Sequence, residues 1–409
     1  MTILIRSRPR PHLQGSIQLP LSKSHLNRLH VLRALDGQSM LPSDANEAQD
    51  SIDLKAALSL LMHPQASDPL LNSGSGGTSF RFLLAYATLN NKPCRIAISE
   101  QLAKRPHREL LDALMQTGNH RIDQHGRIFT IRPERISNSE LHIQVGSTIS
   151  SQFTSALLLA SANHPHRVII ETTSPLQSGY LNMTLELLEQ SGKKILRREN
   201  KILVEGALNP ARIQGLEAEA DWSAAAVWFV WAALSAECSL QFPGLRARST
   251  QPDSHIALLM QNEGVQSSEK DGSLIITKKT NALQNLGPKA YHFEKYPDLY
   301  PVLRALYYIR GKDATFLNTG SLPFKESNRL DAMEFLERSR KQAYTEHTAI
   351  RAKSFDDHRI AFAASLYAVL NDVEIDPSEC IGKSYPSYYE DLKKTGFEVL
   401  FTTKSESEL

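Results

Sequence analysis

Cations and hydroxyls gather at a predicted helix start near the beginning of the chain. The segment Leu19–Arg28 reads Leu-Pro-Leu-Ser-Lys-Ser-His-Leu-Asn-Arg, and the apolar-periodic run after Ser24 predicts a helix. Its proline disfavours helix in the preceding residue, and Ser22 or Ser24 can cap the helix that follows. A helix start suits an anion because its N–H groups are unpaired and its dipole end is positive, and Lys23 and Arg28 add charge. The segment predicts an anion site, with a capped surface helix as the alternative.

A glycine-rich loop precedes a second predicted helix. It runs from Asn72 to Thr78 as Asn-Ser-Gly-Ser-Gly-Gly-Thr, and Arg81 follows one turn later. Its glycines let backbone N–H groups approach an anion closely, while Thr78 and Arg81 add a hydroxyl and a charge. The loop lacks the lysine spacing of a nucleotide P-loop and the spacing of a dinucleotide fingerprint. It predicts a phosphate loop, with a flexible turn as the alternative.

Further polar residues stand at later helix starts. Arg105 follows Lys104 before one predicted helix, where the pair alone would be read as solvated charge. Ser150, Ser151 and Gln152 open a strongly apolar run. Their hydroxyls and amide could hold a polar ligand, although serines at a helix start are usually caps.

The second half of the chain adds acids to this pattern. Asp298 opens an apolar helix, where an acid either stabilises the helix start or serves as a general base for a substrate hydroxyl. The segments 325–329 (Lys-Glu-Ser-Asn-Arg) and 356–359 (Asp-Asp-His-Arg) open two more helices, and Lys383 lies in a turn. An Asp-His pair also suggests a metal, but no second ligand cluster supports one, so we expect none.

These motifs belong to a repeat of elements that must position them. Six times a polar turn leads into an apolar helix-like run, at intervals of roughly 55 to 75 residues. A more amphipathic helix pattern follows each run, and strand pairs follow most of these, one of them at an Asp-Gly turn. The nearly all-apolar first helices predict buried helices. The apolar runs begin near Ser24, Thr78, Ser150, Trp222, Pro297 and His358, and four amphipathic helices end on the expected left-handed caps Gly118, Gly192, Gly264 and Gly396.

The repeats predict an α/β protein of two domains with three units each. A boundary is expected near 217–221, where Glu-Ala-Glu-Ala-Asp precedes the fourth apolar run. The strand before Pro20 is expected to pair with the second domain. We therefore expect residues 21–218 to form an inserted domain and residues 1–20 plus 219–409 to form a discontinuous one.

Composition limits the function classes. The chain has 409 residues and a formal net charge of +2, which argues against a nucleic-acid coat or a polybasic membrane binder. Cys94, Cys238 and Cys380 are widely spaced and form no metal or disulfide pattern, which favours a reducing cytoplasm. The N-terminus lacks the apolar core of a signal peptide, and the most apolar run, 224–236, is too short to span a bilayer.

The predicted cations collect at the starts of the repeated helices. If the helix starts of the two domains face each other, these side chains converge on one cleft and require a highly anionic ligand. The residues alone therefore predict a two-domain enzyme that closes on small phosphorylated acids. The cations are Lys23, Arg28, Arg81, Arg105, Lys325, Arg329, Arg359 and Lys383.

The motifs also stand in an order that one known family shares. They are Ser22-Lys23-Ser24-x-x-Asn27-Arg28, Gly76-Gly77-Thr78-x-x-Arg81, Lys104-Arg105-Pro106, Ser150-Ser151-Gln152, Tyr180 to Thr184, Pro297-Asp298, Lys325-Glu326 to Arg329, Asp357-His358-Arg359 and Lys383. Over essentially the whole chain they resemble the 5-enolpyruvylshikimate-3-phosphate (EPSP) synthase family. The resemblance implies a two-domain inside-out α/β barrel, with three βαβαββ repeats in each domain.

The resemblance also implies a reaction and its setting. The enolpyruvyl group of phosphoenolpyruvate would pass to the 5-hydroxyl of shikimate 3-phosphate with release of phosphate, a step in aromatic amino-acid biosynthesis. No metal or organic cofactor is expected. The protein would be a cytoplasmic monomer whose partners are its two small-molecule substrates, with no nucleic acid and no membrane.

Matching positions assign roles to particular residues. Asp298 would take the 5-hydroxyl proton, and Glu326 with Lys23 would protonate the methylene carbon. Phosphoenolpyruvate would contact Lys23, Gly77, Arg105, Gln152, Arg329, Arg359 and Lys383. Shikimate 3-phosphate would contact Ser24, Arg28, Ser150, Ser151, Gln152, Tyr180, Asp298, Ser321 and Lys325.

Several positions depart from the usual residues of the family. They affect details of substrate contact rather than the charged framework. Ser75 and Ser321 replace asparagines, and Asn328 replaces an aspartate. Gln177 stands where a serine that contacts shikimate 3-phosphate is expected, and Ser174 or Ser178 could serve instead if the loop has shifted. Phe82 follows Arg81 at a position where many members have proline.

Two alternatives remain. UDP-N-acetylglucosamine enolpyruvyl transferases share the fold but need a reactive cysteine ahead of Arg105, where this chain has Glu100, and Cys94 lies upstream in a predicted strand. The other alternative is a non-catalytic relative that binds the anionic ligand, which the presence of Lys23, Asp298 and Glu326 argues against.

Overall fold

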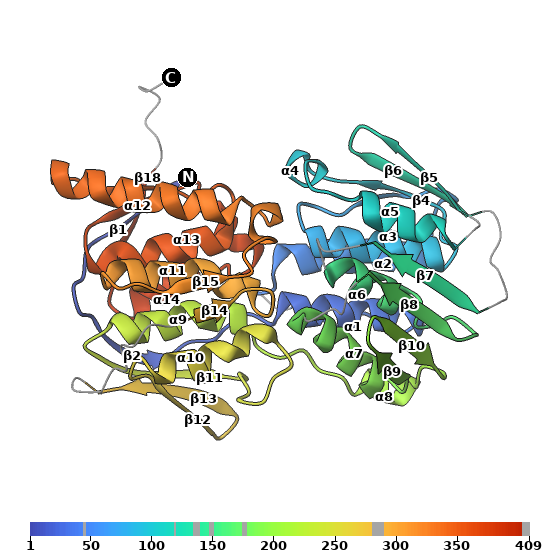
Figure 1. The fold of residues 1–409 in the computed structure, drawn as a ribbon, viewed down its shortest axis with the longest axis horizontal. Coiled ribbons are helices and arrows are strands. Elements are labelled where there is room, and N and C mark those ends of the chain that lie inside the picture. The colour runs from blue at the N-terminus through green and yellow to red at the C-terminus, as the bar shows by residue number, and fades with distance from the viewer. Residues whose placement is uncertain are drawn as a thin grey trace. The chain divides into compact units, whose positions relative to one another are not determined.

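The computed structural model describes residues 1–43, 46–117, 120–133, 140–146, 151–173, 178–279 and 290–402. Two compact units make up the chain. Unit 1 comprises Met1–Ser22, Asn46–Ala48 and Glu219–Leu409, and unit 2 comprises Lys23–Ala45 and Gln49–Ala218. Figure 1 shows that each unit consists of helices with small sheets. A membrane span is not found among the helices of the described residues, because none is both long and apolar enough.

Unit 2 contains two four-stranded sheets of the same topology. In the sheets β3-β4-β6-β5 and β7-β8-β10-β9, the first two strands are parallel and the last two form an antiparallel hairpin. The elements are α1 (Lys23–Leu35), α2 (Gln49–Met62), β3 (Leu70–Asn72), α3 (Gly77–Leu89), β4 (Cys94–Ala97), α4 (Glu100–Ala103), α5 (Arg108–Met115), β5 (His120–His125), β6 (Ile128–Pro133), β7 (Leu141–Val145), α6 (Ser151–Ala160), β8 (Val168–Thr172), α7 (Gly179–Gln190), β9 (Lys194–Arg198), β10 (Lys201–Glu205) and α8 (Pro210–Gln214).

Unit 1 begins with β1 (Thr2–Ile5) and β2 (His12–Ser16). Its other elements are α9 (Trp222–Leu234), β11 (Glu237–Pro243), η1 (Pro252–His255), α10 (Ile256–Gln261), β12 (Gln266–Lys270), β13 (Ser273–Lys278), β14 (Ala290–His292), η2 (Pro297–Leu299), α11 (Tyr300–Ile309), β15 (Thr315–Leu317), η3 (Leu322–Phe324), α12 (Arg329–Glu346), β16 (Ile350–Lys353), α13 (His358–Leu366), η4 (Tyr367–Val369), β17 (Val373–Asp376), η5 (Glu379–Lys383), α14 (Tyr388–Lys394) and β18 (Val399–Thr402).

The sheets of unit 1 use strands from both ends of the chain. β2 lies parallel to β11 at the edge of the sheet β12-β13-β11-β2, so the strand before Pro20 pairs as the sequence predicted. β1 lies antiparallel between β17 and β18 and takes the place that the last strand of a repeat holds in the other four-stranded sheets. A two-stranded parallel sheet, β14-β15, flanks α11.

The six predicted apolar runs are confirmed as helix starts. α9 is buried on every side over 224–233, and α3 over 79–88, as expected for helices that are apolar all round. Polar atoms on such helices need partners, and in α9 Trp228 and Trp231 donate through Nε1 to Tyr385 Oη at 3.3 Å and Tyr388 Oη at 3.1 Å. The helices therefore form the cores, while β5, β9 and β12 are largely exposed, which is the inside-out arrangement.

Local turn signals also agree with the structure. The three predicted hairpins are β5–β6, β9–β10 and β12–β13, the last closed by Asp271-Gly272. Gly192, Gly264 and Gly396 have φ of 105°, 83° and 91°, as caps beyond helix ends require. The predicted cap Gly118 and the predicted frayed tail at 404–409 lie outside the described residues.

Candidate active site

In unit 1, three helix starts bring an acid and two arginines together. Asp298 lies in η2, Arg329 is the first residue of α12, and Arg359 lies in the first turn of α13. Arg329 Nη1 is 2.6 Å from Asp298 Oδ1, and Arg359 Nη2 is 2.8 Å from Asp298 Oδ2. Both guanidinium groups are buried, and they share the carboxylate of Asp298.

This arrangement changes the acidity of Asp298. Burial alone would raise its pKa, but the charges of Arg359, Arg329 and Lys325 outweigh burial and lower the pKa of Asp298 far below its ordinary value. Asp298 is therefore a carboxylate, and it is a poor proton acceptor while both arginines remain on it.

Asp357 fixes the orientation of Arg329 and of α13. It accepts from Arg359 N at 3.0 Å as the cap of α13, and Arg329 Nε lies 2.9 Å from its Oδ2. The preceding residues Phe355 and Asp356 have φ of 53° and 59°, a left-handed pair that is unfavourable for non-glycine residues. Lys383 Nζ donates to Asp356 O at 2.8 Å and pairs with Asp356 Oδ2 at 2.6 Å, which holds this turn in place.

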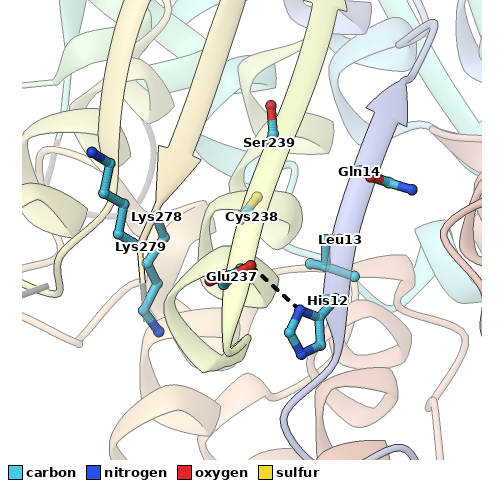
Figure 2. Close-up of a pocket in the computed structure, with 8 residues that line it drawn as sticks. All are labelled: His12, Leu13, Gln14, Glu237, Cys238, Ser239, Lys278 and Lys279. Carbon is cyan, nitrogen blue, oxygen red and sulfur yellow. Dashed lines mark ion pairs between the residues drawn. The ribbon is translucent and has the colours of Figure 1, made fainter. Parts of the chain in front are cut away.

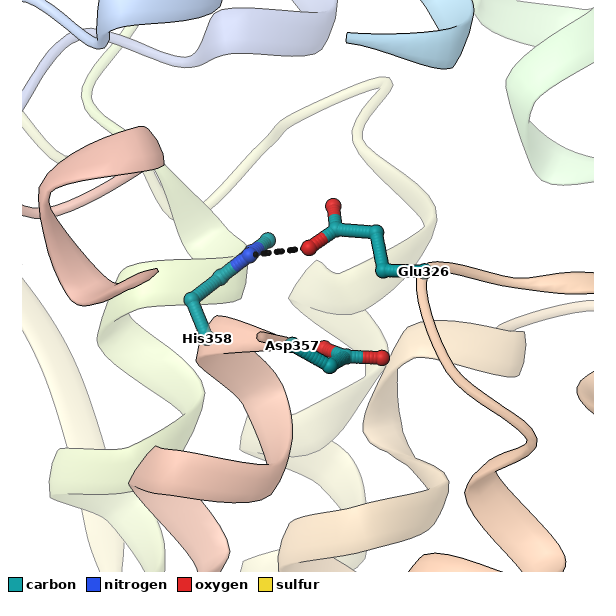
Figure 3. Close-up of side chains that lie close together, drawn as sticks. All are labelled: Glu326, Asp357 and His358. Carbon is teal, nitrogen blue, oxygen red and sulfur yellow. Dashed lines mark hydrogen bonds and ion pairs between the residues drawn. The ribbon is translucent and has the colours of Figure 1, made fainter. Parts of the chain in front are cut away.

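Glu326 lies beside His358. Figure 3 shows the Glu326 carboxylate facing the imidazole ring, with Oε2 2.9 Å from Nδ1. His358 Nε2 is in turn 2.5 Å from Arg359 Nη1. The ligand atoms of Glu326, Asp357 and His358 lie within 4.8 Å of one another, a spacing that could suit a metal ion. Arg329 and Arg359 touch two of these three groups, and their charges disfavour a cation there, so we read the cluster as one that orients Glu326.

The two remaining predicted residues of unit 1 flank η3. Ser321 precedes it and Lys325 follows it, and the charge of Lys325 acts on Asp298. The departure at Asn328 has a structural explanation. Its side chain accepts from Leu330 N at 3.2 Å and from Asp331 N at 3.5 Å, so it caps α12 as an aspartate would.

In unit 2, the glycine-rich loop is the meeting point of charged side chains. Lys23, the first residue of α1, pairs with Asp50 of α2 at 2.9 Å. A Cβ on Gly76 would lie 2.7 Å from Asp50 Cγ, and a Cβ on Gly77 would lie 2.8 Å from Arg105 Nη1 and 3.0 Å from Arg81 Nη1. We expected these glycines to admit an anion to the backbone; the structure shows that they also admit neighbouring side chains.

Arg81 and Arg105 form a pair of cations against Gly77. Arg81 Nη1 donates to Gln152 Oε1, and its guanidinium lies 5.2 Å from the centroid of the Phe153 ring. Burial, and then the charge of Arg105, lower the pKa of Arg81 to about 9. Among the described residues, Arg105 Nε and Nη2 are buried without a hydrogen-bond partner. The pair is therefore preorganised to accept an anion.

Arg28 occupies a second cationic position in unit 2. Its Nη1 donates to Ser24 O at 2.6 Å, Nη2 to Tyr180 O at 3.0 Å and Nε to Thr184 Oγ1 at 2.8 Å. Burial lowers the pKa of Arg28 to about 10. Predicted phosphate ligands Ser24 and Tyr180 thus lie beside Arg28, whose guanidinium also faces Phe82 at 5.2 Å. Ser150, Ser174 and Gln177, and the side chain of Ser151, lie outside the described residues.

Some side chains of these clusters were missed by the sequence reading. Asp50, Thr184, Ser223 and Asp253 were not predicted to belong to a site, although Thr184 ends one of the quoted motifs. Asp50 and Asp253 each stand in the first turn of a helix, where an acid is normally attributed to the helix dipole. Only their long-range partners identify them, and these are invisible in the sequence.

A pocket of about 670 Å³ lies elsewhere in unit 1 and contains none of the predicted site residues. Figure 2 shows its walls on β2, β11 and β13, with His12 Nδ1 3.6 Å from Glu237 Oε2. Lys278 lines it, but its ammonium donates to Ala233 O at 2.5 Å and Ser235 O at 2.7 Å, at the carboxyl end of α9. That contact stabilises the helix end, and the pocket has no evident part in the chemistry.

The alternative that depends on a reactive cysteine has no support in the geometry. Cys94 lies in β4 and is fully buried, and burial, with a smaller contribution from Asp68, raises the pKa of its thiol to about 12. A thiol in that state is not a nucleophile.

The chain is similar to known proteins over nearly its whole length. The family model described as EPSP synthase (3-phosphoshikimate 1-carboxyvinyltransferase) matches residues 17–392. A 3-phosphoshikimate 1-carboxyvinyltransferase of Bacteroides fragilis is 28% identical over 410 residues, covering 95% of this chain and 96% of the relative. One of Methanocorpusculum labreanum is 25% identical over 426 residues, covering 95% and 98%. An EPSP synthase structure from Acinetobacter baumannii matches with a TM-score of 0.67 at 16% identity, covering 98% of this chain and all of that one, which shows the shared fold.

Proposed function

Because the chain belongs to the EPSP synthase family, we propose which of its residues perform the reaction of that family, the transfer of the enolpyruvyl group of phosphoenolpyruvate to shikimate 3-phosphate. One observation carries the assignment. Arg81 and Arg105 lie together against Gly77 in unit 2, and Arg329 and Arg359 lie together on Asp298 in unit 1. Paired guanidinium groups of this kind suit substrates that carry both phosphate and carboxylate.

In this proposal, binding and chemistry are distributed over both units. Lys23, Gly77, Arg105 and Gln152 of unit 2, with Arg329, Arg359 and Lys383 of unit 1, hold phosphoenolpyruvate. Shikimate 3-phosphate is held by Ser24, Arg28, Ser150, Ser151, Gln152 and Tyr180 of unit 2, with Asp298, Ser321 and Lys325 of unit 1. The fixed cations offset the repulsion between two anionic substrates.

Asp298 is proposed as the general base for the 5-hydroxyl. Its pKa is low because Arg329 and Arg359 lie on it. When the anionic groups of phosphoenolpyruvate take up part of the positive charge of these arginines, the pKa of Asp298 rises. The base is therefore activated by the cosubstrate, and the hydroxyl is deprotonated only when an acceptor is present.

Glu326 is proposed to supply the proton. The 5-hydroxyl oxygen forms a bond to C2 of phosphoenolpyruvate while Glu326, with Lys23, delivers a proton to the methylene carbon. The resulting tetrahedral adduct then loses phosphate and a methyl proton, which restores the enolpyruvyl group on the product. His358, 2.9 Å from Glu326, orients the carboxyl group for this transfer.

The assay that tests the assignment is phosphate release with both substrates present, repeated with each omitted. Release only in the complete mixture supports the reaction, and release that continues without shikimate 3-phosphate would contradict it. We further propose that the protein acts as a cytoplasmic monomer; its three buried thiols are unpaired, as suits a reducing compartment. Sedimentation of the full chain tests the oligomeric state.

A further inference from the structure

Asp253 is a buried acid that the assignment above does not use. Its side chain comes from η1 and is 1% exposed. Asp253 Oδ2 accepts a hydrogen bond from Ser223 Oγ, and Ser223 Oγ accepts one from Arg359 Nη2 at 3.2 Å. One hydroxyl therefore connects Asp253 to an arginine that is assigned to phosphoenolpyruvate.

The connection places a third carboxylate on a pair of cations. Asp298 contacts both Arg329 and Arg359, and Asp357 contacts Arg329 at 2.9 Å. If Asp221, Asp253, Asp298 and Asp357 were all ionised, four negative charges would face the three positive charges of Arg329, Arg359 and Lys325 in a buried cluster. Such a cluster would repel the anion that the arginines are meant to bind, and one proton on one acid removes this excess.

Contacts distinguish Asp253 from Asp298 and Asp357. Asp298 and Asp357 touch guanidinium nitrogens directly, whereas Asp253 reaches Arg359 through the Ser223 hydroxyl. The charged groups that face Asp253 are Asp298 of η2, Arg359 of α13 and Asp221 before α9, and two of these three are negative. Burial, and then the charge of Asp298, raise the pKa of Asp253 to about 7. Asp253 is the acid that holds the proton at least cost.

We propose that Asp253 carries a proton in the state of the enzyme that binds phosphoenolpyruvate, and that its ionisation at higher pH weakens the hold of Arg359 on this substrate. Asp253 is thus a positioning residue that acts through Ser223 and Arg359. The inference rests on the role of Arg359 proposed above, and it adds a group that sets the pH range over which the substrate binds.

The test is the pH profile of kcat/KM for phosphoenolpyruvate at saturating shikimate 3-phosphate, in the wild type and in Asp253→Asn. Asparagine keeps the shape and the acceptor oxygen but cannot ionise. The substrates ionise in the same way in both assays. The ratio of kcat/KM for the variant to kcat/KM for the wild type therefore reports the ionisation of Asp253 alone. We expect the ratio to rise roughly threefold to tenfold between about pH 6 and 8.5. A ratio that stays constant over this range would overturn the inference.

A matched control is Asp391→Asn. Asp391 of α14 is a second acid of unit 1 that is 1% exposed. It accepts a hydrogen bond from Tyr385 Oη at 2.8 Å and pairs with Lys394 at 2.7 Å, and neither partner belongs to the proposed site. The ratio of this variant to wild type should not change with pH. A rise equal to that of Asp253→Asn would show that the effect is not specific and would overturn the inference.

A second variant keeps the inference testable if Asp253→Asn fails to fold. The hydrogen bond from Ser223 lowers the pKa of Asp253, so Ser223→Ala should move the alkaline fall of kcat/KM to higher pH.

Thermal unfolding of the wild type and of Asp253→Asn gives a readout that needs no substrate. Because the pKa of Asp253 is raised above 3.8 on folding, its contribution to stability is present at low pH and is lost as pH rises towards 7. Asp253→Asn should therefore gain stability relative to wild type as pH rises; an unchanged difference in Tm would contradict the inference.

Arg359→Gln separates this inference from the proposed function. At about pH 6.5 we expect this variant to lose at least ~100-fold in kcat/KM for phosphoenolpyruvate. If it loses nothing, the proposed role of Arg359 fails, whatever Asp253→Asn shows. If it loses activity while the Asp253→Asn ratio stays constant with pH, only the inference about Asp253 is overturned.

Discussion

Replacing Arg105 with glutamine should stabilise the unliganded protein while damaging its function. Arg105 and Arg81 meet at Gly77, where both Nη1 atoms lie within 3.0 Å of the same Cβ position, so they are no more than about 6 Å apart. Among the described residues, Arg105 Nε and Nη2 are buried without a hydrogen-bond partner. The substitution therefore removes the repulsion between the charges of Arg105 and Arg81, and it breaks few hydrogen bonds.

The expected magnitude follows from that separation. Two unit charges about 6 Å apart repel by about 3 kcal/mol at an effective dielectric constant of about 20. Arg105 is only partly buried, and solvent screening reduces the gain in unfolding free energy to about 1–2 kcal/mol. In a unit of this size such a gain raises Tm by about 3–6 °C. Loss of a charged donor to phosphoenolpyruvate should cost about 2–5 kcal/mol in kcat/KM.

The assay combines calorimetry of the unliganded protein with steady-state kinetics. Lys104→Gln is the matched control, because Lys104 is the neighbouring cation, is 74% exposed and pairs with Glu100 at 2.8 Å. It should change the unfolding free energy by less than about 0.5 kcal/mol and leave the kinetics intact. If Arg105→Gln lowered Tm and left kcat/KM unchanged, the assignment of Arg105 as an unneutralised ligand-binding cation would be wrong.

Three further variants test the rest of the site. Asp298→Ala should lower kcat by about 10²–10⁴-fold and leave shikimate 3-phosphate affinity largely intact by titration calorimetry, and an unchanged kcat would remove Asp298 as the base. Gly77→Ala should raise KM for phosphoenolpyruvate about tenfold or more in steady-state kinetics, because the new methyl group would lie 2.8 Å from Arg105 Nη1 and displace it. An unchanged KM would mean that the position of the Arg105 guanidinium does not matter for binding this substrate. Cys94→Ala should retain kcat, because the thiol is fully buried in β4, and loss of turnover without loss of stability would revive a mechanism that uses this cysteine.

Signals that act within a few residues were read correctly from the sequence. Asp271-Gly272 predicted a hairpin, Gly192 predicted a left-handed helix end, and the apolar run from Trp222 predicted a buried helix. Each depends on local backbone preference or on the absence of polar side chains. The position of β1 between β17 and β18 could not be read in this way, because its partners lie more than 360 residues away and several strands are equally apolar.

The candidate site shows the same contrast between local signals, which were read correctly, and long-range partners, which were not. Lys23, Arg105 and Arg359 were identified by type and by position at helix starts. Their partners were not, because Asp50 and Asp253 resemble ordinary helix-start acids until the fold places them beside a cation. The positive φ angles of Phe355 and Asp356 were not predicted from the sequence either. Aspartate enters the left-handed region more readily than most residues, but phenylalanine does not, and the pair gives no turn signal of the glycine kind.

The two units solve the problem of buried cations differently, and the difference bears on how substrates bind. In unit 2, the guanidinium groups of Arg81 and Arg105 face each other, so an arriving anion relieves a repulsion already present. In unit 1, Arg329 and Arg359 are already neutralised by Asp298 and Asp357, so an anion must compete with bound carboxylates. In the mechanism that we propose, this competition weakens binding, and the pKa of Asp298 rises as the ligand draws the arginines away. The unneutralised arginines of unit 2 would then strengthen substrate binding, and the neutralised arginines of unit 1 would couple substrate binding to proton transfer by Asp298.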